Sequence, residues 1–510
     1  MLRFDGELSF GHQILSFDVP IGTTAISITG TTIKTGFLYG YLYDAEQQLR
    51  GNVLWVKAHK KLVITADSAS LGGIVGNVMA GQWQFNLYNL EGENRAPKAM
   101  QYQVDVTFEC VSKADEHANL LGVATTKNLI ADNSIIFDYS NIKNSASKWY
   151  RGDLHAHTLL SDGHNTLEAA TDIVENQGLD FFFLTEHNIC HPALPVSDET
   201  LILPGIEVTT DQGHFNVHGP RCGLNMFNTT YSSEALIKQG LSLVGEQQQG
   251  SISINHPMMK PWHWHFDSLQ LSDVNTMEIC CDPTWSSSPM ATENALTTLS
   301  TMWNAGHRIA GVGGSDSHLE PHDRNPKATE PSIYGDPSTF VFSHGLSGEG
   351  ILTGLQQGQV YIERRCGLAF SLNQGNVLPG QNVGEQSVDY HLAVAVADED
   401  NHYYAECIAD GVVISTLPIT SEGIDVHINM AQYMWVRFDI RRGVFSDYDI
   451  SDCDPSETEI ETESTHRQQI QKGEFEGMIN PIYNGNHPHY SSPTLATWGE
   501  LMKEVEHNGN

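Results

Sequence analysis

The sequence lacks the pattern of a thiolate metal site, because its eight cysteines include no CxxC pair. Cys280 and Cys281 are adjacent, but neighbouring side chains of a strand point to opposite faces, so we do not expect this pair to share an ion. Buried free thiols in a reducing compartment fit the cysteines better than a disulfide framework does. The beginning "MLRFDGELSFGHQ" lacks the basic start and apolar core of a signal peptide. No apolar run approaches the roughly 18–20 residues that cross a bilayer, and we therefore expect a cytoplasmic protein.

Positive charge is also scarce. Lysine and arginine number 27 against 62 aspartates and glutamates, which gives a formal net charge of −35. Such a surface repels DNA, RNA and anionic lipid, so we expect neither a nucleic-acid duplex nor a membrane as a partner. A hydrophobic content of 40% and a charged content of 17% are typical of a folded soluble protein. A chain of 510 residues is too long for one hydrophobic core, so several domains are expected.

Sequence patterns divide the chain into three regions, and the expected fold class is multidomain α/β plus β. Residues 1–147 contain short runs with period-two alternation, which predict a β-sandwich or jelly roll. Residues 149–367 alternate apolar strands with helix patterns and place polar residues at strand ends. This predicts a (β/α) barrel-like domain whose site lies at the carboxyl ends of the strands. Residues 368–510 return to strand alternation and predict a small β domain with a flexible acidic segment at 446–464.

The stretch "RGDLHAHTLLSDG" contains the first candidate site residues. In an extended strand His155 and His157 project to the same face, so both could bind one ion. Asp162 follows shortly after the strand. Taken alone, such a pair of histidines on a strand is more often structural or solvent-facing than metal-binding.

The same arrangement recurs along this region, because later apolar runs also end in histidine or a carboxylate. These side chains are the usual ligands of zinc, manganese and iron, and the strand ends of one barrel meet at one mouth. About eight converging ligands exceed what one tetrahedral ion takes, so we expect two or three divalent ions (Zn, Mn or Fe) bridged by Glu207. The later candidates are His187, Glu207, His214, His218, His256, Asp316 and His318.

The motifs "DLHAHT…SDG", "LTEHN", "PGIEVTTDQGHFNVHG", "INHP" and "GGSDSH" occur in an order and spacing that resemble the PHP (polymerase and histidinol phosphatase) domain. More narrowly, the chain resembles metallohydrolases of the CehA/McbA-type branch. The segments "WNAGHRIAGVGGSDSH", "YGDPSTFVF" and "GLQQGQVYI" are similar to elements of that branch, and "YDAEQQLRG" is similar to a signature of its N-terminal β domain. The resemblance implies a distorted (β/α)7 barrel between the two β domains.

The resemblance also implies how the ligands are shared between ions. The first ion would be held by His155, His157, Glu207 and Asp316. Glu207 would bridge to a second ion, and the remaining ligands would be His214 and His256 for the second ion and Asp162, His187 and His318 for the third.

Three neighbouring positions qualify this assignment. His214 follows a glycine as the family's histidine does, while His218 would replace it after a small register shift. Asp153 would orient a ligand histidine rather than bind an ion. The family usually shows "TDHN" where this chain has "TEHN", so Glu186 is one methylene longer than expected; it either orients His187 or touches the third ion.

The implied chemistry is metal-assisted hydrolysis, most consistent with a phosphoesterase, in which clustered cations lower the pKa of a bound water and polarise the oxygen under attack. No nucleophilic serine is required, and the sequence contains no GxSxG elbow. The catalytic candidates are Asp316, His187 and His318, of which the histidines could protonate the leaving group. One alternative is a carboxylester or aryl carbamate hydrolase. The other is a carbohydrate-binding protein whose metal site is structural or dead.

The substrate is expected to be a small-molecule phosphoester or ester. The loop after His256 contains Lys260, Trp262 and His263, which could clasp a flat or sugar-bearing organic phosphate; alternatively the loop packs its own tryptophans. Further candidates near the site are Arg324 and His322 as anion contacts, Arg151 towards the far end of the barrel, and Glu278 as a supporting acid.

Overall fold

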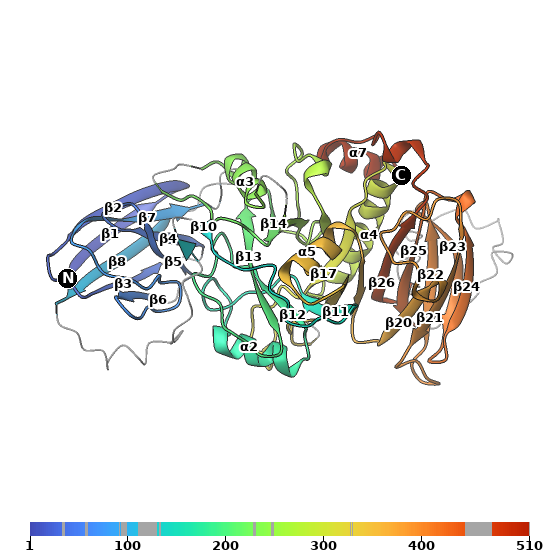
Figure 1. Cartoon of the computed structure of the whole chain (residues 1–510). Helices are drawn as coiled ribbons and strands as arrows, with labels where there is room; N and C mark the ends of the chain where they lie inside the picture. The colour runs from blue at the N-terminus through green and yellow to red at the C-terminus, as the bar shows by residue number, and fades with distance from the viewer. Residues whose placement is uncertain are drawn as a thin grey trace.

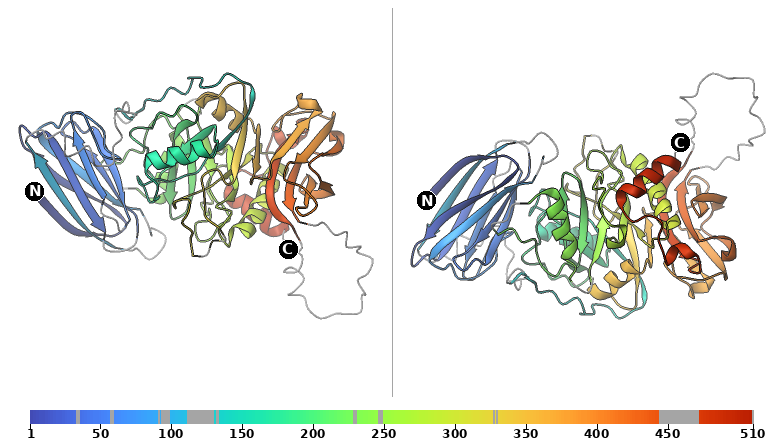
Figure 2. Two further views of the ribbon diagram at one scale, coloured as in Figure 1. Left: turned by 90° about the horizontal axis from the view of Figure 1, so that it is seen from below. Right: turned by 90° about the horizontal axis from the view of Figure 1, so that it is seen from above.

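The computed structural model describes residues 1–32, 36–56, 60–90, 92, 99–110, 130–131, 134–227, 231–245, 249–326, 328, 330–443 and 472–508. Two β-rich regions flank a central region, and the three follow one another in chain order (Figure 1). Two further views, from below and from above, show the same elongated arrangement (Figure 2). The acidic segment expected at 446–464 lies outside the described residues.

The N-terminal region consists of two four-stranded antiparallel sheets that share one apolar core. In β2, Leu15, Phe17 and Val19 are buried and alternate with exposed Ser16 and Asp18, which is the pattern of a strand with one face in a core. The sheets have the orders β1-β8-β3-β6 and β2-β7-β4-β5. Their strands are β1 (Leu2–Leu8), β2 (Gly11–Val19), β3 (Ala25–Thr32), β4 (Leu38–Tyr43), β5 (Leu49–Trp55), β6 (Lys60–Thr65), β7 (Gly81–Asn89) and β8 (Met100–Glu109).

A 13-stranded sheet forms the centre of the molecule, in the order β17-β16-β15-β14-β13-β12-β11-β18-β19-β26-β25-β22-β23. Parallel pairing joins β11 to β12, β12 to β13, β15 to β16 and β16 to β17, and the other described neighbours are antiparallel. The strands of the central region are β11 (Lys148–Asp153), β12 (Phe181–Leu184), β13 (Leu201–Thr210), β14 (Gly213–His218), β15 (Ser251–Ile254), β16 (Thr276–Cys281), β17 (Ala310–Gly314), β18 (Ser338–Ser343) and β19 (Val360–Glu363). A short two-stranded ladder of β9 (Ile130–Ala131) and β10 (Ser134–Ile135) precedes them.

Helices of this region begin and end at residues that the sequence pattern marks. The side chain of Thr166 accepts a hydrogen bond from the backbone of Ala169 and caps α2, and Gly178 with a φ of 69° follows the helix. None of the described helices is long and apolar enough to cross a bilayer. The helices are α2 (Leu167–Asn176), α3 (Ser233–Ser242), η1 (Leu271–Asp273), α4 (Ser288–Asn304) and α5 (Gly348–Gln356).

The central sheet departs from the regular strand–helix alternation of the expected (β/α)7 barrel. β13 and β14 form a hairpin, because Asp211 and Gln212 complete a tight turn and Gly213 adopts a positive φ of 122°. Among the described strands, no backbone ladder joins β17 to β18 or β19. Instead the Thr339 hydroxyl on β18 accepts from the Gly313 amide at 2.9 Å and donates to its carbonyl at 2.7 Å. The edge strand β17 therefore approaches the interior strand β18 through hydrogen bonds of a side chain.

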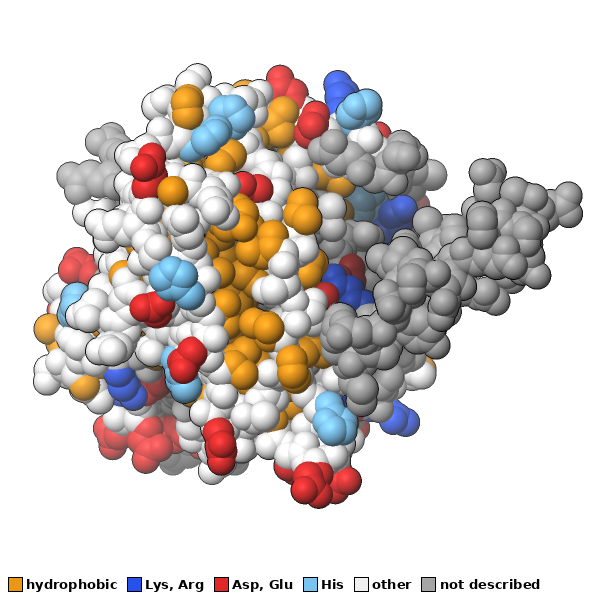
Figure 3. Space-filling view, turned by 90° about the vertical axis from the view of Figure 1, so that its right-hand side faces the viewer, with side chains coloured by type: hydrophobic (Ala, Val, Ile, Leu, Met, Phe, Trp, Pro, Cys, Tyr) orange, Lys and Arg blue, Asp and Glu red, His pale blue; other side chains and the backbone are white. Residues whose placement is uncertain are grey.

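The C-terminal region continues the same sheet, because β26 pairs with β19 on one side and β25 on the other. A three-stranded sheet of β20, β21 and β24 packs against it. On this end of the molecule hydrophobic side chains form a band (Figure 3), and edge strand β23 carries exposed Val412, Val413 and Ile414. The elements are β20 (Leu368–Leu372), η2 (Asn373–Gly375), β21 (Ser387–Val394), β22 (Tyr403–Ala409), β23 (Val412–Ile419), β24 (Ile424–Asn429), η3 (Met430–Gln432), β25 (Trp435–Arg442), β26 (Glu474–Tyr483), η5 (Pro488–Tyr490) and α7 (Trp498–Asn508).

Asn480 on β26 forms hydrogen bonds that join the C-terminal region to the central region. Its buried amide nitrogen donates to the carbonyls of Gly311 at 2.7 Å and Val360 at 3.1 Å, and its oxygen accepts from the Gly311 amide at 2.7 Å. One side chain therefore binds β26 to both β17 and β19.

We predict that Asn480→Ala destabilises the fold by about 2–4 kcal/mol, because it leaves buried backbone groups of Gly311 without partners. The measurement is the urea concentration at the unfolding midpoint, followed by tryptophan fluorescence. Asn486→Ala, at an exposed asparagine, is the matched control. Equal midpoints for the two variants would contradict the bridging role of Asn480.

Candidate metal centre

The candidate site residues follow directly after the strands of the central sheet. β11 ends just before His155, β12 just before His187, β15 before His256 and β17 before Asp316. Because parallel pairing places the carboxyl ends of β11 and β12, and of β15 and β17, at one edge, the four side chains come from one side of the sheet.

Two of these residues have unusual backbone conformations. His256 has a φ of 29° and Asp316 a φ of 49°, in the left-handed region that side chains other than glycine seldom adopt. Hydrogen bonds hold both, from the His256 amide to Glu278 at 2.8 Å and from the Asp316 amide to the His155 carbonyl at 2.9 Å. Gly314 must be a glycine, because a Cβ there would lie 2.5 Å from atoms of His155 and Glu278.

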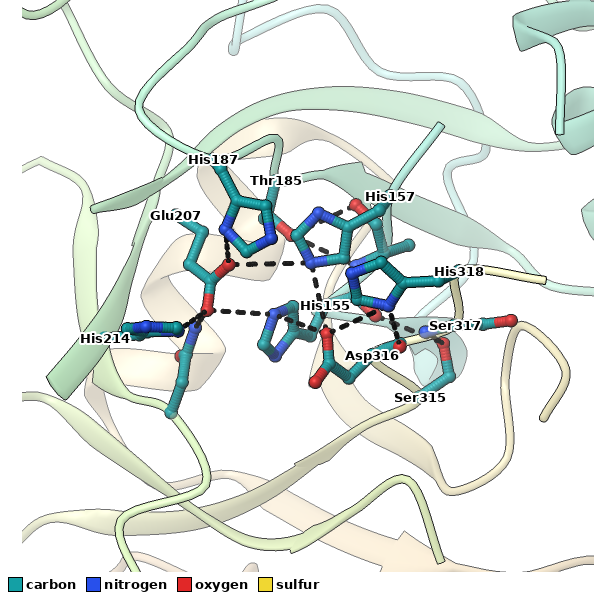
Figure 4. Close-up of polar contacts among 12 residues, drawn as sticks. His155, His157, Thr185, His187, Glu207, His214, Ser315, Asp316, Ser317 and His318 are labelled. Atoms are coloured by element: carbon teal, nitrogen blue, oxygen red, sulfur yellow. Dashed lines mark hydrogen bonds and ion pairs between the residues drawn. The ribbon is translucent and has the colours of Figure 1, made fainter. Parts of the chain in front are cut away.

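Glu207 lies at the centre of the cluster (Figure 4). Its Oε1 is 3.3 Å from Nε2 of His155 and 3.1 Å from Nδ1 of His214. Its Oε2 is 2.6 Å from Nδ1 of His187 and 3.5 Å from Nε2 of His157. Nε2 of His256 lies 3.5 Å from Oε1. One fully buried carboxylate therefore faces five imidazoles from four strands or strand ends.

Asp316 and Asp162 extend the cluster on the other side of His157. Oδ1 of Asp316 is 3.2 Å from Nε2 of His155 and 3.1 Å from Nε2 of His157. Oδ1 of Asp162 is 3.3 Å from Nε2 of both His187 and His318. The His157 ring stacks against both of these histidines, with centroid separations of 4.4 Å to His187 and 4.2 Å to His318.

Three potential metal-ligand atoms of the cluster are buried and make no hydrogen bond. They are Nε2 of His155, Nε2 of His157 and Oε2 of Glu207. Buried polar atoms without partners are costly, and a cation is a partner that lone pairs of nitrogen and oxygen accept. The residues therefore fit divalent ions. Groups whose ligand atoms lie within 4.8 Å of one another are His155–His157–Glu207, His187–Glu207–His214, His157–Asp162–His187–His318 and His155–Cys281–Asp316.

Charge in the cluster favours the ionised acids. Burial alone would raise the pKa of Glu207, but His187, His155 and His214 lower it well below its ordinary value. Burial lowers the pKa of His157 to about 4, helped by His318 and His187. The carboxylate is thus anionic and the His157 imidazole neutral at pH 7, which is the state in which both bind metals.

Further side chains orient these ligands without facing the centre of the cluster. Oε1 of Glu278 lies 2.9 Å from Nδ1 of His155, which leaves Nε2 directed at Glu207 and Asp316. Asp153 accepts from three backbone amides, those of His155, Ser315 and Gly335, and so ties the end of β11 to the segment after β17. Such outer contacts fix the ring orientation that a ligand histidine needs.

Glu186 holds the loop that carries Asp162. Its carboxylate accepts from the backbone amides of Thr158 at 3.0 Å and Ser161 at 3.2 Å, from both hydroxyls, and contacts Nε2 of His191 at 2.8 Å. Glu186 belongs to none of the potential metal-binding groups among the described residues. The extra methylene of "TEHN" therefore serves to reach the loop.

Other candidates from the sequence lie away from the cluster. His218 is buried on β14, and its Nε2 lies 2.8 Å from the Leu154 carbonyl, so His214 is the histidine of this strand that faces Glu207. Arg151 donates to the Gln177 carbonyl and the Ser338 hydroxyl. Lys260 and Arg324 are exposed, and neither belongs to the described lining of the cavity next to the cluster. His322 is exposed beside Glu320 and Asp323.

A cavity of about 550 Å³ opens onto the cluster. Trp262 and His263 line it, as the sequence suggested for substrate contacts, whereas Trp285 was not anticipated. Phe37 and Tyr39 of the N-terminal region form another part of the wall, and the Phe37 ring lies 4.9 Å from that of His187. Sequence reasoning missed Phe37 and Tyr39 because nothing in a local pattern links the N-terminal region to a site formed by residues of the central region.

Three further side chains at the site were not among the site residues predicted from the sequence. Asn255 donates to Oε1 of Glu207 at 3.0 Å, and its position directly before His256 was the available signal. Asp282 lines the cavity, and burial raises its pKa to about 6. Cys281 is a buried free thiol, as expected, and its Sγ lies 3.8 Å from Oδ2 of Asp316, a contact that the sequence did not indicate. Burial and the carboxylates of Glu278, Asp316 and Asp282 raise the pKa of this thiol well above its ordinary value.

No family model matches the chain, and no curated protein matches it. A solved structure from Bacteroides vulgatus, described as a two-domain protein containing a predicted PHP-like metal-dependent phosphoesterase, is 16% identical, with a TM-score of 0.34 over 62% of this chain and 95% of that one. PliG of Aeromonas hydrophila, a periplasmic inhibitor of g-type lysozyme, is 7% identical, with a TM-score of 0.14 over 21% of this chain and 85% of that one. With TM-scores this low, the functional conclusion depends on the geometry of the site.

We predict that Glu186→Gln lowers the thermal midpoint of the metal-free protein at pH 7. Burial alone would raise the pKa of Glu186, but His191 and Ser161 lower it from 4.5 to about 2, which is worth on the order of 3 kcal/mol. Because the folded-state pKa is lowered, this stabilisation is complete above pH 4.5 and is lost as the pH falls towards 2.

The difference between the variant and the wild type should therefore shrink over that pH range. Thermal unfolding followed by circular dichroism at several pH values measures it, with exposed Glu199→Gln as the control. A difference independent of pH would show that the charge of Glu186 does not anchor the loop.

Proposed function

We propose that the chain is a metal-dependent hydrolase that cleaves phosphoesters at a centre of two or three divalent ions, of zinc, manganese or iron. The observation that carries this proposal is the meeting of Glu207 and Asp316 with the unpartnered Nε2 atoms of His155 and His157. Nitrogen and oxygen donors around a cavity are the ligand set of hydrolytic metal centres.

We propose the division of ligands that the sequence resemblance implies. Glu207 would bridge two ions, and His155, His157 and Asp316 would hold the first of them. His214 and His256 would complete the second position, and Asp162, His187 and His318 would form the third. When bound, the ions supply a water of lowered pKa and polarise the oxygen under attack.

Proton transfer to the leaving group falls to the histidines near Asp162. Burial would lower the pKa of His318, but Asp162 outweighs this effect and raises it to about 9. In the metal-free chain His318 therefore carries a proton at pH 7. With two ions bound, His318 or His187 donates this proton at Nε2; with three bound, both are ligands.

The proposal includes a PHP-type barrel of the CehA/McbA-type branch. It is supported by the order of the sequence motifs and by the Thr339–Gly313 contacts, which bring β18 to the edge strand β17. The boundaries expected from the sequence, at 147 and 367, remain part of this proposal as the limits of three domains.

The cavity wall supports a small-molecule substrate with an apolar part. Trp262, Trp285, Phe37 and Tyr39 present ring surfaces beside the cluster. Aromatic rings bind flat groups through their faces. Such a wall suits an organic ester better than inorganic phosphate.

We predict that His155→Ala and Asp316→Ala each lower the rate of hydrolysis by about a thousandfold or more, because each removes a metal ligand. The imidazole of His155 faces the carboxylates of Glu207 and Asp316, and the carboxylate of Asp316 faces the imidazoles of His155 and His157. The initial rate with p-nitrophenyl phosphate and bis-p-nitrophenyl phosphate measures the loss. His402→Ala and Asp400→Ala, exposed in the C-terminal region, are the matched controls. Full activity in either site variant would refute the assignment.

The same assay separates the alternatives. Turnover of 1-naphthyl acetate alone would make the protein a carboxylester hydrolase with the same centre. Elemental analysis of the purified chain adds the test for a binding protein, since no bound metal and no metal-dependent turnover would leave only the carbohydrate-binding alternative.

We predict that Phe37→Ala raises the KM for bis-p-nitrophenyl phosphate about fivefold, the equivalent of about 1 kcal/mol of lost aromatic contact, and leaves the metal content unchanged. The physical reason is the position of the Phe37 ring in the cavity wall, 4.9 Å from His187. Phe108→Ala is the control, since Phe108 belongs to the same region but packs against Phe17. An unchanged KM would remove the N-terminal region from the substrate site.

A further inference from the structure

Cys281 reaches the site because β16 contains an irregularity. The pairing of β16 with β17 shifts between Glu278 and Cys280, so that Glu278 faces Val312 while Cys281 faces Gly314. In a regular strand, residues 278 and 281 would point to opposite faces. A bulge inserts one extra residue and re-aims the side chains after it, so both Glu278 and Cys281 point towards His155 and Asp316.

The neighbouring cysteine points the other way. Cys280 is as fully buried as Cys281, but its surroundings are Arg364, Asp336 and Thr292 of α4 rather than the cluster. The two buried thiols therefore project from opposite faces of β16, and only Cys281 lies on the face of the cluster.

The atoms around Cys281 have the spacing of a coordination shell. Ligand atoms of Cys281, His155 and Asp316 all lie within 4.8 Å of one another. Sγ is 3.8 Å from Oδ2 of Asp316, and Nε2 of His155 is 3.2 Å from Oδ1 of Asp316. With Cys281 the first ion would have five ligands, and metal–sulfur bonds of about 2.3 Å and metal–nitrogen bonds of about 2.0 Å would then place neighbouring donors about 2.8–3.7 Å apart.

A second observation points to a ligand at the same place. Nε2 of His155 is fully buried, has no hydrogen-bond partner, and is directed towards Asp316 by the bond between Nδ1 and Glu278. Cys281 therefore lies beside a nitrogen lone pair and a carboxylate, both of which can bind the same cation as its sulfur.

We propose that Cys281 is a thiolate ligand of the ion that His155 and Asp316 hold. The thiol proton leaves to solvent when the metal–sulfur bond forms. A sulfur donor favours zinc over manganese or magnesium at this position, because harder cations prefer oxygen. The inference rests on the proposed metal centre and adds a ligand and a metal preference to it.

Cobalt substitution of the full chain tests the inference without an activity assay. Cobalt(II) bound to a thiolate gives a charge-transfer absorption in the near ultraviolet, whereas cobalt bound only to nitrogen and oxygen does not. The wild type and Cys280→Ser should show this band. Cys281→Ser should lose it, keep the visible cobalt bands, and bind cobalt about tenfold more weakly or worse.

X-ray absorption at the zinc edge of the wild type gives a second measurement, which does not depend on how the variants fold. A sulfur neighbour at about 2.3 Å is expected. Bound metal without a sulfur neighbour, or a charge-transfer band that persists in Cys281→Ser, would overturn the role of Cys281 while leaving the metal centre in place. Failure of the wild type to bind cobalt or zinc would overturn the proposed centre itself.

Discussion

The burial of the Glu207 carboxylate among histidines is the constraint on which the rest of the site depends. A buried negative charge is tolerated only where positive charge or hydrogen bonds compensate it. His155, His187 and His214 surround Glu207 from separate strands or strand ends, so its position fixes theirs. The charge also explains why donor atoms with no hydrogen bond persist there, since a cation between carboxylate and imidazole satisfies both.

The N-terminal and C-terminal regions form hydrogen bonds that help to position the strands and loops of the site. On the C-terminal side, Asn480 binds β26 to β17, the strand that delivers Asp316. On the N-terminal side, Tyr41 donates to the Asn188 carbonyl at 2.9 Å, one residue after His187. The site is therefore built from the central region, and hydrogen bonds from both flanking regions help to position it.

The sequence was informative where local geometry alone decides the placement of a side chain. His155 and His157 share a face because extended side chains alternate, and Asp316 follows an apolar run whose end lies at the same edge of the sheet. It was uninformative where placement depends on an irregularity or on a distant segment. The bulge that turns Cys281 inward leaves no mark in the residue pattern, and Phe37 meets His187 through contact between segments about 150 residues apart in the sequence. The β13–β14 hairpin was missed although Gly213 marks its turn, because the expected alternation of strands and helices was extended through it.

Asp162 differs from the other ligands in how it is held. The others stand on strands or directly after them, whereas Asp162 belongs to the loop that Glu186 anchors through Thr158 and Ser161. Lys60 of the N-terminal region also donates to the Ser161 carbonyl, and burial lowers its pKa to about 8.

In the proposed centre, the third metal position would depend on contacts that the first two do not need. A loop held by one buried carboxylate and one lysine of the N-terminal region moves more readily than a strand end. Binding of a third ion would therefore depend on the contact between the N-terminal region and this loop. The longer side chain of Glu186 fits this division, because an aspartate at the end of β12 would be one methylene shorter than the carboxylate that now reaches both Thr158 and Ser161.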